Sequence, residues 1–185
     1  MTVSIMPGGW IMAGINTGRM THDYAISEDG VTEGNTDRDL VVFLIGMTIN
    51  RWWRPDRWLP VFAAMPRMLR ELSQDKESGL LGYRLIFDLR GPWLVQYWSS
   101  LDKLYAYASD PAATHRPAWA AYNRNARKAG GVVGVWHETF QVEHAESIYV
   151  NTPLQGLAKA TGIKPVTGRL NTARQRITQE PSSPA

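Results

Sequence analysis

The chain has 185 residues, a formal net charge of +3 and no cysteine. The lack of cysteine excludes disulfides, thiol catalysis, iron–sulfur clusters and cysteine-ligated zinc. The positive charge is small and dispersed, which argues against a nucleic-acid partner. The longest apolar stretch, residues 40–49, is about half the length that spans a bilayer, and residues 1–14 lack the layout of a signal peptide. We therefore expect a cytoplasmic protein of one domain without a membrane span.

Three regions follow from the composition along the chain. Residues 1–38 are rich in Gly, Thr, Asp and Asn, which predicts an extended N-terminal arm without a fold of its own. Residues 39–152 carry strong apolar periodicity and form the expected α/β domain. Residues 153–185 predict a C-terminal extension with a short helical piece and a basic tail.

The α/β domain begins with a predicted strand over residues 40–50. A helix follows, with Asp56 as a candidate N-cap, Pro60 in its first turn and a kink at Pro66. Its apolar residues recur at helical spacing; they are Trp58, Val61, Phe62, Met65, Met68, Leu69 and Leu72.

The second half of the domain begins with a hairpin signal, Arg90-Gly91-Pro92, which joins strands predicted over residues 80–89 and 93–98. Helical pieces over residues 101–109 and 117–128 come next. A strand over residues 132–140 and a short extended piece over residues 147–151 complete the domain.

This order, β-α-β-β-α-β, predicts the α+β class and the ferredoxin-like split βαβ arrangement. Two helices cover one face of a four-stranded sheet and leave the other face open. An open apolar face needs a partner, so we expect a homodimer that packs through the sheet.

The most informative polar residues are His137 and Glu138, which interrupt the apolar strand Val132–Phe140 after Trp136. Burying either group without a partner is costly. Neighbouring strand residues point to opposite faces, so one of the two is expected at a pocket and the other at an interface or a hydrogen-bond partner. A histidine with a purely structural partner is an equal alternative.

Alternation on the other strands adds further polar candidates. The first strand carries Thr48 and Asn50, the second Arg84 and Asp88, and the third Gln96 and Trp98. If these faces coincide, they form one concave surface suited to a largely apolar substrate. A wetted sheet face or a polar dimer seam would show the same pattern.

Several motifs together resemble a monooxygenase-like family of the dimeric α/β-barrel superfamily, over about residues 40–160. That family has a fungal relative in the fumagillin pathway, and the antibiotic-biosynthesis monooxygenases share the superfamily. The motifs are Phe43-Leu44-Ile45-Gly46-Met47, Ala64-Met65-Pro66-Arg67-Met68-Leu69, Gly79-Leu80-Leu81-Gly82, Gln96-Tyr97-Trp98, His115 with Trp119, Trp136-His137-Glu138-Thr139, and Ile148-Tyr149-Val150-Asn151-Thr152-Pro153.

The resemblance implies a dimeric α/β barrel and an oxygenase of secondary metabolism that works without a cofactor. In such enzymes the deprotonated substrate itself passes an electron to dioxygen. His137 or His115 would remove the proton, with Glu138 as an accessory carboxylate acting on a different histidine or through a neighbouring strand. Substrate contacts would come from the candidates Asn50, Arg84, Gln96, Trp98, Tyr107 and Trp136.

Haem-binding members of the superfamily offer an alternative. They carry an Asn late in the first strand, an aromatic residue in the following crossover helix and a His beyond it, and Asn50, Tyr107 and His115 are similarly placed here. In this alternative His115 or His137 is the axial ligand. Tyr107 stands where those relatives use Trp, and His115 could also cap a helix end. Other metal sites are not expected, because no histidine or carboxylate cluster has ligand spacing. A nicotinamide or flavin site is not expected either, since no Gly-x-Gly-x-x-Gly motif follows a strand.

The sequence thus predicts a small homodimeric monooxygenase acting on an apolar, electron-rich metabolite without flavin. A haem protein of the same fold, a non-oxidative isomerase or cyclase, and a ligand-binding protein without chemistry are the alternatives.

Overall fold

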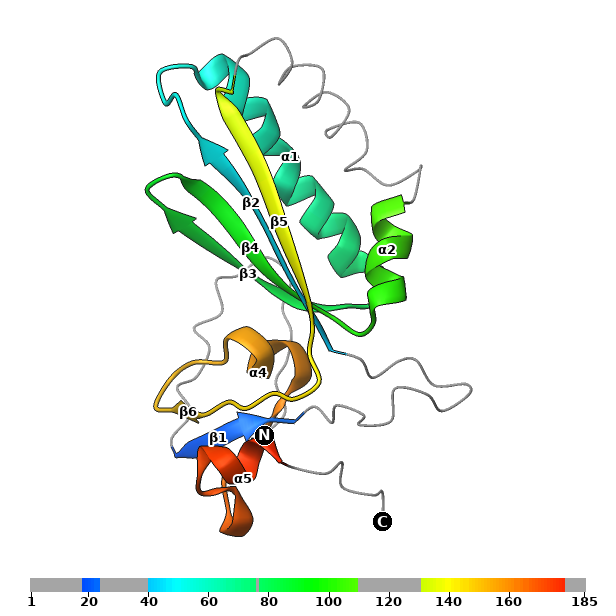
Figure 1. The fold of residues 1–185 in the computed structure, drawn as a ribbon, viewed down its shortest axis with the longest axis vertical. Helices are drawn as coiled ribbons and strands as arrows, with labels where there is room; N and C mark the ends of the chain where they lie inside the picture. Colours follow the sequence, from blue (N-terminus) through cyan, green and yellow to red (C-terminus); the bar gives the residue numbers. More distant parts are fainter. Residues whose placement is uncertain (1–17, 24–39, 76, 110–130, 179–185) are drawn as a thin grey trace.

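A four-stranded antiparallel sheet is the centre of the computed structural model, which describes residues 18–23, 40–75, 77–109 and 131–178. Its strands stand in the order β3-β4-β2-β5 (Figure 1). Their bounds are Val41–Ile49 for β2, Leu80–Asp88 for β3, Gly91–Trp98 for β4 and Val133–Gln141 for β5. With helices α1 (Pro55–Gln74) and α2 (Leu101–Ser109), this order confirms the predicted ferredoxin-like α+β fold.

The strand register divides the sheet into two faces. Val41 pairs with Trp98, and Ile45 pairs with both Leu94 and His137, so these side chains share one face. We call it the covered face, because Val41 and Trp98 form a buried cluster with Leu72 of α1 and Leu104 of α2. A second cluster joins Met47, Ile49, Val132 and Val133, against which Trp58, Val61 and Phe62 of α1 pack.

We call the opposite face the open face, because neither α1 nor α2 covers it. Its middle carries Leu44, Gly46, Val95 and Trp136. One end is covered by the C-terminal helix α4 (Gly156–Thr161), because a Cβ built on Gly82 would lie 2.9 Å from the Cβ of Ala160. The rest of this face presents half-buried apolar side chains to the surroundings.

Helix α1 departs from the prediction at its start. It begins at Pro55, so Asp56 lies in the first turn and not at the N-cap. Proline is well tolerated at the first helical position, where its missing N–H has no partner in any case. Pro60 and Pro66 both lie further inside the helix, so the placement of Pro60 in the first turn is also wrong.

A second, three-stranded sheet lies beyond the end of the first (Figure 1). The order is β6-β1-β7, formed by Tyr149–Val150, Arg19–His22 and Ile163–Pro165. The region expected to be an extended arm therefore supplies the central strand of this sheet. Local sequence could not predict this, because the partners of Met20 are Tyr149 and Pro165, more than a hundred residues away.

Buried polar contacts fix helix α5 to the segments around this sheet. Arg176 of α5 (Ala173–Ile177) is 7% exposed, and its Nε donates to Glu146 Oε1 at 2.6 Å. Its Nη1 donates to the carbonyl oxygens of Leu170, in the 3₁₀ helix Gly168–Leu170, and Asn171 at 2.9 and 3.2 Å. A charged group is tolerated in a buried position when it is paired and hydrogen-bonded in this way.

None of the described helices is long and apolar enough to cross a membrane.

Strand β1 is tied down by His22, which predicts a pH dependence of stability. Its backbone N–H donates to Ser147 Oγ at 3.0 Å, and its Nδ1 lies 2.7 Å from the same oxygen. Burial, and then the charge of Lys164, lower the pKa of His22 from 6.5. As the pH falls below about 6.5, the unfolded chain takes up a proton that the folded protein resists, so the free energy of unfolding should decrease.

The measurement is chemical denaturation at about pH 7.5 and about pH 5.5. In His22→Asn, the side-chain oxygen can still accept the Ser147 hydroxyl but does not titrate, so the loss of stability between these conditions should be smaller than in the wild type. His144→Asn, at an exposed position past β5, is the control. An unchanged loss in His22→Asn would contradict the assignment.

Gly46 predicts a local packing limit on the open face. A Cβ at this position would lie 2.7 Å from Trp136 Cε2 and 2.7 Å from Trp93 Cβ, so Gly46→Ala must displace the two indoles. We expect a loss of about 1–3 kcal/mol in the free energy of unfolding, measured by denaturant titration. Gly134→Ala is the matched control on the neighbouring strand, because its Cβ would meet only Thr48 Cβ at 3.8 Å. Equal stability of the two variants would refute the argument.

Candidate functional site

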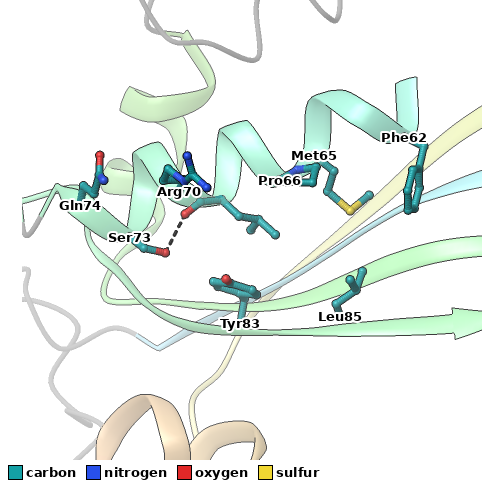
Figure 2. Close-up of a pocket in the computed structure, with 9 residues that line it drawn as sticks. Phe62, Met65, Pro66, Arg70, Ser73, Gln74, Tyr83 and Leu85 are labelled. Atoms are coloured by element: carbon teal, nitrogen blue, oxygen red, sulfur yellow. Dashed lines mark hydrogen bonds between the residues drawn. The ribbon is translucent and has the colours of Figure 1, made fainter. Parts of the chain in front are cut away.

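A groove of about 440 Å³ lies between α1 and β3 on the covered face (Figure 2). Its volume is within the range of small-molecule sites. The lining residues are Phe62, Met65, Pro66, Leu69, Arg70, Ser73, Gln74, Tyr83 and Leu85.

Simple periodicities place these residues together. The lining positions of α1 recur every three or four residues, which puts them on one side of the helix. Tyr83 and Leu85 are two residues apart on β3 and therefore point to the same face of the sheet. The groove exists because β3 is an edge strand, where α1 leaves Tyr83 and Leu85 each 38% exposed.

The groove has an apolar end and a polar end. At the apolar end Phe62 faces Leu85 across the groove (Figure 2), and its ring lies 6.4 Å from that of Phe87. Arg70, Ser73 and Gln74 mark the polar end. The Ser73 hydroxyl donates to the carbonyl oxygen of Leu69 at 2.6 Å, so its proton is already engaged.

Arg70 gives the polar end a positive charge. The guanidinium has no ion-pair partner in the part of the chain that the structure describes. A cation at the end of an apolar groove suits a largely apolar molecule that carries an oxygen anion or a strong acceptor.

His137 and Glu138 lie on opposite faces of β5, as their adjacency predicts. His137 is on the covered face, where its ring lies 5.7 Å from that of Phe43. Glu138 is on the open face beside Leu44. Both side chains are exposed, and neither lines the groove.

The polar strand residues do not share one face, so the condition for a single concave surface is not met. Gln96 and Trp98 lie on the covered face, where Trp98 Nε1 donates to Gln96 Oε1 at 3.0 Å within the core. Arg84 pairs with Val95 and lies on the open face, as does Trp136, whose indole lies 6.0 Å from that of Trp93. Alternation along one strand could not reveal the register between strands, which decides this.

The residues suggested for haem do not form one site. Asn50 follows β2 and donates through Nδ2 to the carbonyl oxygen of Gly131 at 2.8 Å. The ring of Tyr107 packs 5.8 Å from that of Trp98, which pairs with Val41 at the opposite end of β2. The eight residue steps from Val41 to Ile49 span about 26 Å, which is too far for one bound group.

His115 and the helix expected over residues 117–128 lie outside the described residues. Within the described ranges, no three or more His, Asp or Glu side chains gather as metal ligands would. Among the described residues, Asn50 and Tyr107 therefore do not line one haem site, and no cluster suits a metal ion.

The groove itself was missed at the level of sequence. The helical spacing of Phe62, Met65 and Leu69 predicts a helix, but not what its apolar side contacts. The signal of a groove is the continuation of the same spacing into Arg70, Ser73 and Gln74, which are polar and suit a rim rather than a core.

Comparison with solved structures gives distant likenesses. SnoaB, a cofactor-independent oxygenase from Streptomyces nogalater, is 12% identical, with a TM-score of 0.37 over 58% of this chain and 96% of that chain. A dimeric ferredoxin-like protein of unknown function from Jannaschia is 19% identical, with a TM-score of 0.38 over 54% of this chain and 97% of the other.

An aldoxime dehydratase, OxdRE, solved with butyraldoxime, is 14% identical. It has a TM-score of 0.55 over 82% of this chain, which spans 41% of the dehydratase. At this identity the likeness supports the fold alone.

The family comparison is more specific. No curated protein matches the chain. A family model described as Monooxygenase af470-like matches residues 40–157, which include strands β2, β3, β4 and β5 of the main sheet and helices α1 and α2. The match confirms the resemblance of the sequence motifs: the protein belongs to the Monooxygenase af470-like family and is a monooxygenase-like enzyme.

Proposed function

We propose that this enzyme is a homodimeric monooxygenase of secondary metabolism that oxidises an apolar, electron-rich metabolite without flavin or haem. The observation that carries the proposal is the groove between α1 and β3, with its apolar end at Phe62 and Leu85 and its cationic end at Arg70. The apolar body of the substrate lies along Met65 and Leu69, and an acidic hydroxyl or carbonyl oxygen points toward Arg70.

The chemistry begins with removal of a proton from the substrate. His137 acts as the general base, and Arg70 stabilises the resulting oxyanion. The anion gives one electron to dioxygen, and the substrate radical and superoxide then combine to a peroxide. The peroxide takes back the proton held by His137 and then loses water. This converts the attacked carbon, which still bears one hydrogen, into a carbonyl, so one oxygen atom enters the product and the other leaves as water. Apolar walls shield the anion from bulk solvent.

The homodimer is part of the proposal because of the open face. Leu44, Val95, Trp93 and Trp136 form a half-buried apolar strip in the middle of this face, with charges at its borders. A two-fold partner that presents the same strip would remove it from water.

His137→Ala tests the proposed base. Turnover should fall by about 10²- to 10⁴-fold, which is the usual contribution of general-base catalysis. The melting temperature should hardly change, because the imidazole is exposed and packs only at the surface beside the ring of Phe43. The measurement is dioxygen uptake with a panel of apolar phenols and naphthols, beside thermal denaturation of the same samples.

His144→Ala is the matched control, since His144 is also exposed and lies just past β5. His115→Ala in the same assay compares the second candidate base. If His137→Ala keeps full turnover while His115→Ala loses it, the base is not on β5.

A further inference from the structure

We propose that the reaction site is shared between two subunits, so that the groove of one subunit is completed by His137 of the partner subunit. This inference rests on the proposed function, which calls for a homodimer and a base. It adds which edges of the two sheets meet, and which subunit supplies the base to which groove.

Among the described residues, those that line the groove of a single subunit include no base. None of its nine lining residues is a histidine, an aspartate or a glutamate. Within one subunit His137 lies in the same row of the covered face as Leu85, but at the other edge of the sheet. The row runs Leu85, Leu94, Ile45, His137, and its three strand spacings amount to about 14 Å.

Both ends of that row are open edges. In the main sheet β3 and β5 are the outermost strands, so each has one side without a partner strand in the described structure. Exposed strand edges are templates for pairing with another chain, and closing a barrel removes them. A β3 edge and a β5 edge from two copies can therefore pair with each other.

The charges on the open face select this pairing. Arg84, Val95, Leu44 and Glu138 form one row across the sheet, with a cation at the β3 edge, two apolar residues in the middle and an anion at the β5 edge. In the described part of the chain neither Arg84 nor Glu138 has an ion-pair partner.

A two-fold axis that runs parallel to the strands places this row against the same row of the partner subunit in reverse order. Arg84 then meets Glu138 of the partner subunit, and the two apolar centres of the rows face each other. An axis across the strands would instead bring Arg84 onto its own copy, which is unfavourable. The arrangement of charges therefore favours the axis along the strands.

The same axis determines which residues of the partner subunit lie beside the groove. Successive strands of the sheet are antiparallel, so β3 and β5 run in opposite directions. Rotation about an axis parallel to the strands does not change these directions, so β3 of one subunit is antiparallel to β5 of the partner subunit. When Arg84 stands opposite Glu138 of the partner subunit, the next residue, Leu85, stands opposite His137 of the partner subunit. Both of these side chains lie on the covered faces, so the imidazole reaches the rim formed by Leu85 and Tyr83.

Disulfide trapping tests the arrangement directly, because the native chain has no cysteine. The double variant Leu85→Cys/His137→Cys should form a covalent dimer on mild oxidation, seen on a non-reducing gel. Neither single variant should do so. A disulfide within one subunit is excluded, since bridged Cα atoms lie within about 7 Å and these are about twice as far apart.

The outcomes separate the two proposals. A double variant that is dimeric by light scattering but cannot be cross-linked overturns the shared site and leaves the homodimer standing. A monomer by light scattering, for both the variant and the wild type, overturns the homodimer of the proposed function as well.

Subunit complementation tests the shared site by activity. Leu85→Trp fills the groove and His137→Ala removes the base, so each protein alone should be inactive in dioxygen uptake with the phenol or naphthol that the wild type oxidises fastest. Leu89→Trp, at a turn position 95% exposed, is the control for the bulky substitution.

After the two inactive proteins are mixed and allowed to exchange subunits, roughly a quarter of wild-type turnover should return, because half of the dimers then carry one intact site of two. If both proteins are inactive and their mixture stays inactive, the base and groove belong to the same subunit and the inference is wrong. If neither variant loses activity, the site assigned in the proposed function is wrong.

Discussion

The pairing register of β2 is the constraint on which the rest of the structure depends. This central strand pairs with β4 on one side and β5 on the other, and its alternation assigns every side chain of the sheet to a face. A shift by one residue would bring Glu138 under the helices and turn Trp98 out of the core. Gly46 favours this register, because only a residue without a Cβ leaves room at this position for the side chains of Trp93 and Trp136.

The two faces of the sheet therefore carry different groups. The covered face holds the core, the groove and His137, while the open face holds an apolar strip bordered by Arg84 and Glu138. His137 and Glu138 are adjacent in sequence and serve opposite sides of the sheet. In the proposed enzyme the histidine is thus a base, and the carboxylate is an interface residue that positions it.

Much of the fold could be predicted from the sequence, because it depends on local periodicity. The strand over Leu80–Asp88 and the helix over Leu101–Ser109 lie where the pattern of apolar residues predicts them, and the resulting order predicts the sheet. Strand β1 could not be predicted, since a four-residue strand shows itself only through partners far along the chain. The sequence does not show which group Gln96 bonds to, whereas in the structure its side-chain oxygen accepts a hydrogen bond from Trp98. Such pairings depend on register and rotamer, which periodicity does not contain.

The central claim is that this fold oxidises an apolar substrate with dioxygen and with no other redox partner. The most direct measurement is the mass of the product formed by the purified protein under ¹⁸O₂, in a sample whose absorption spectrum shows neither flavin nor haem. If dioxygen is the oxidant, the product contains one ¹⁸O atom and the second atom is recovered in water. A product without ¹⁸O, or turnover that requires added flavin or haem, would contradict the claim.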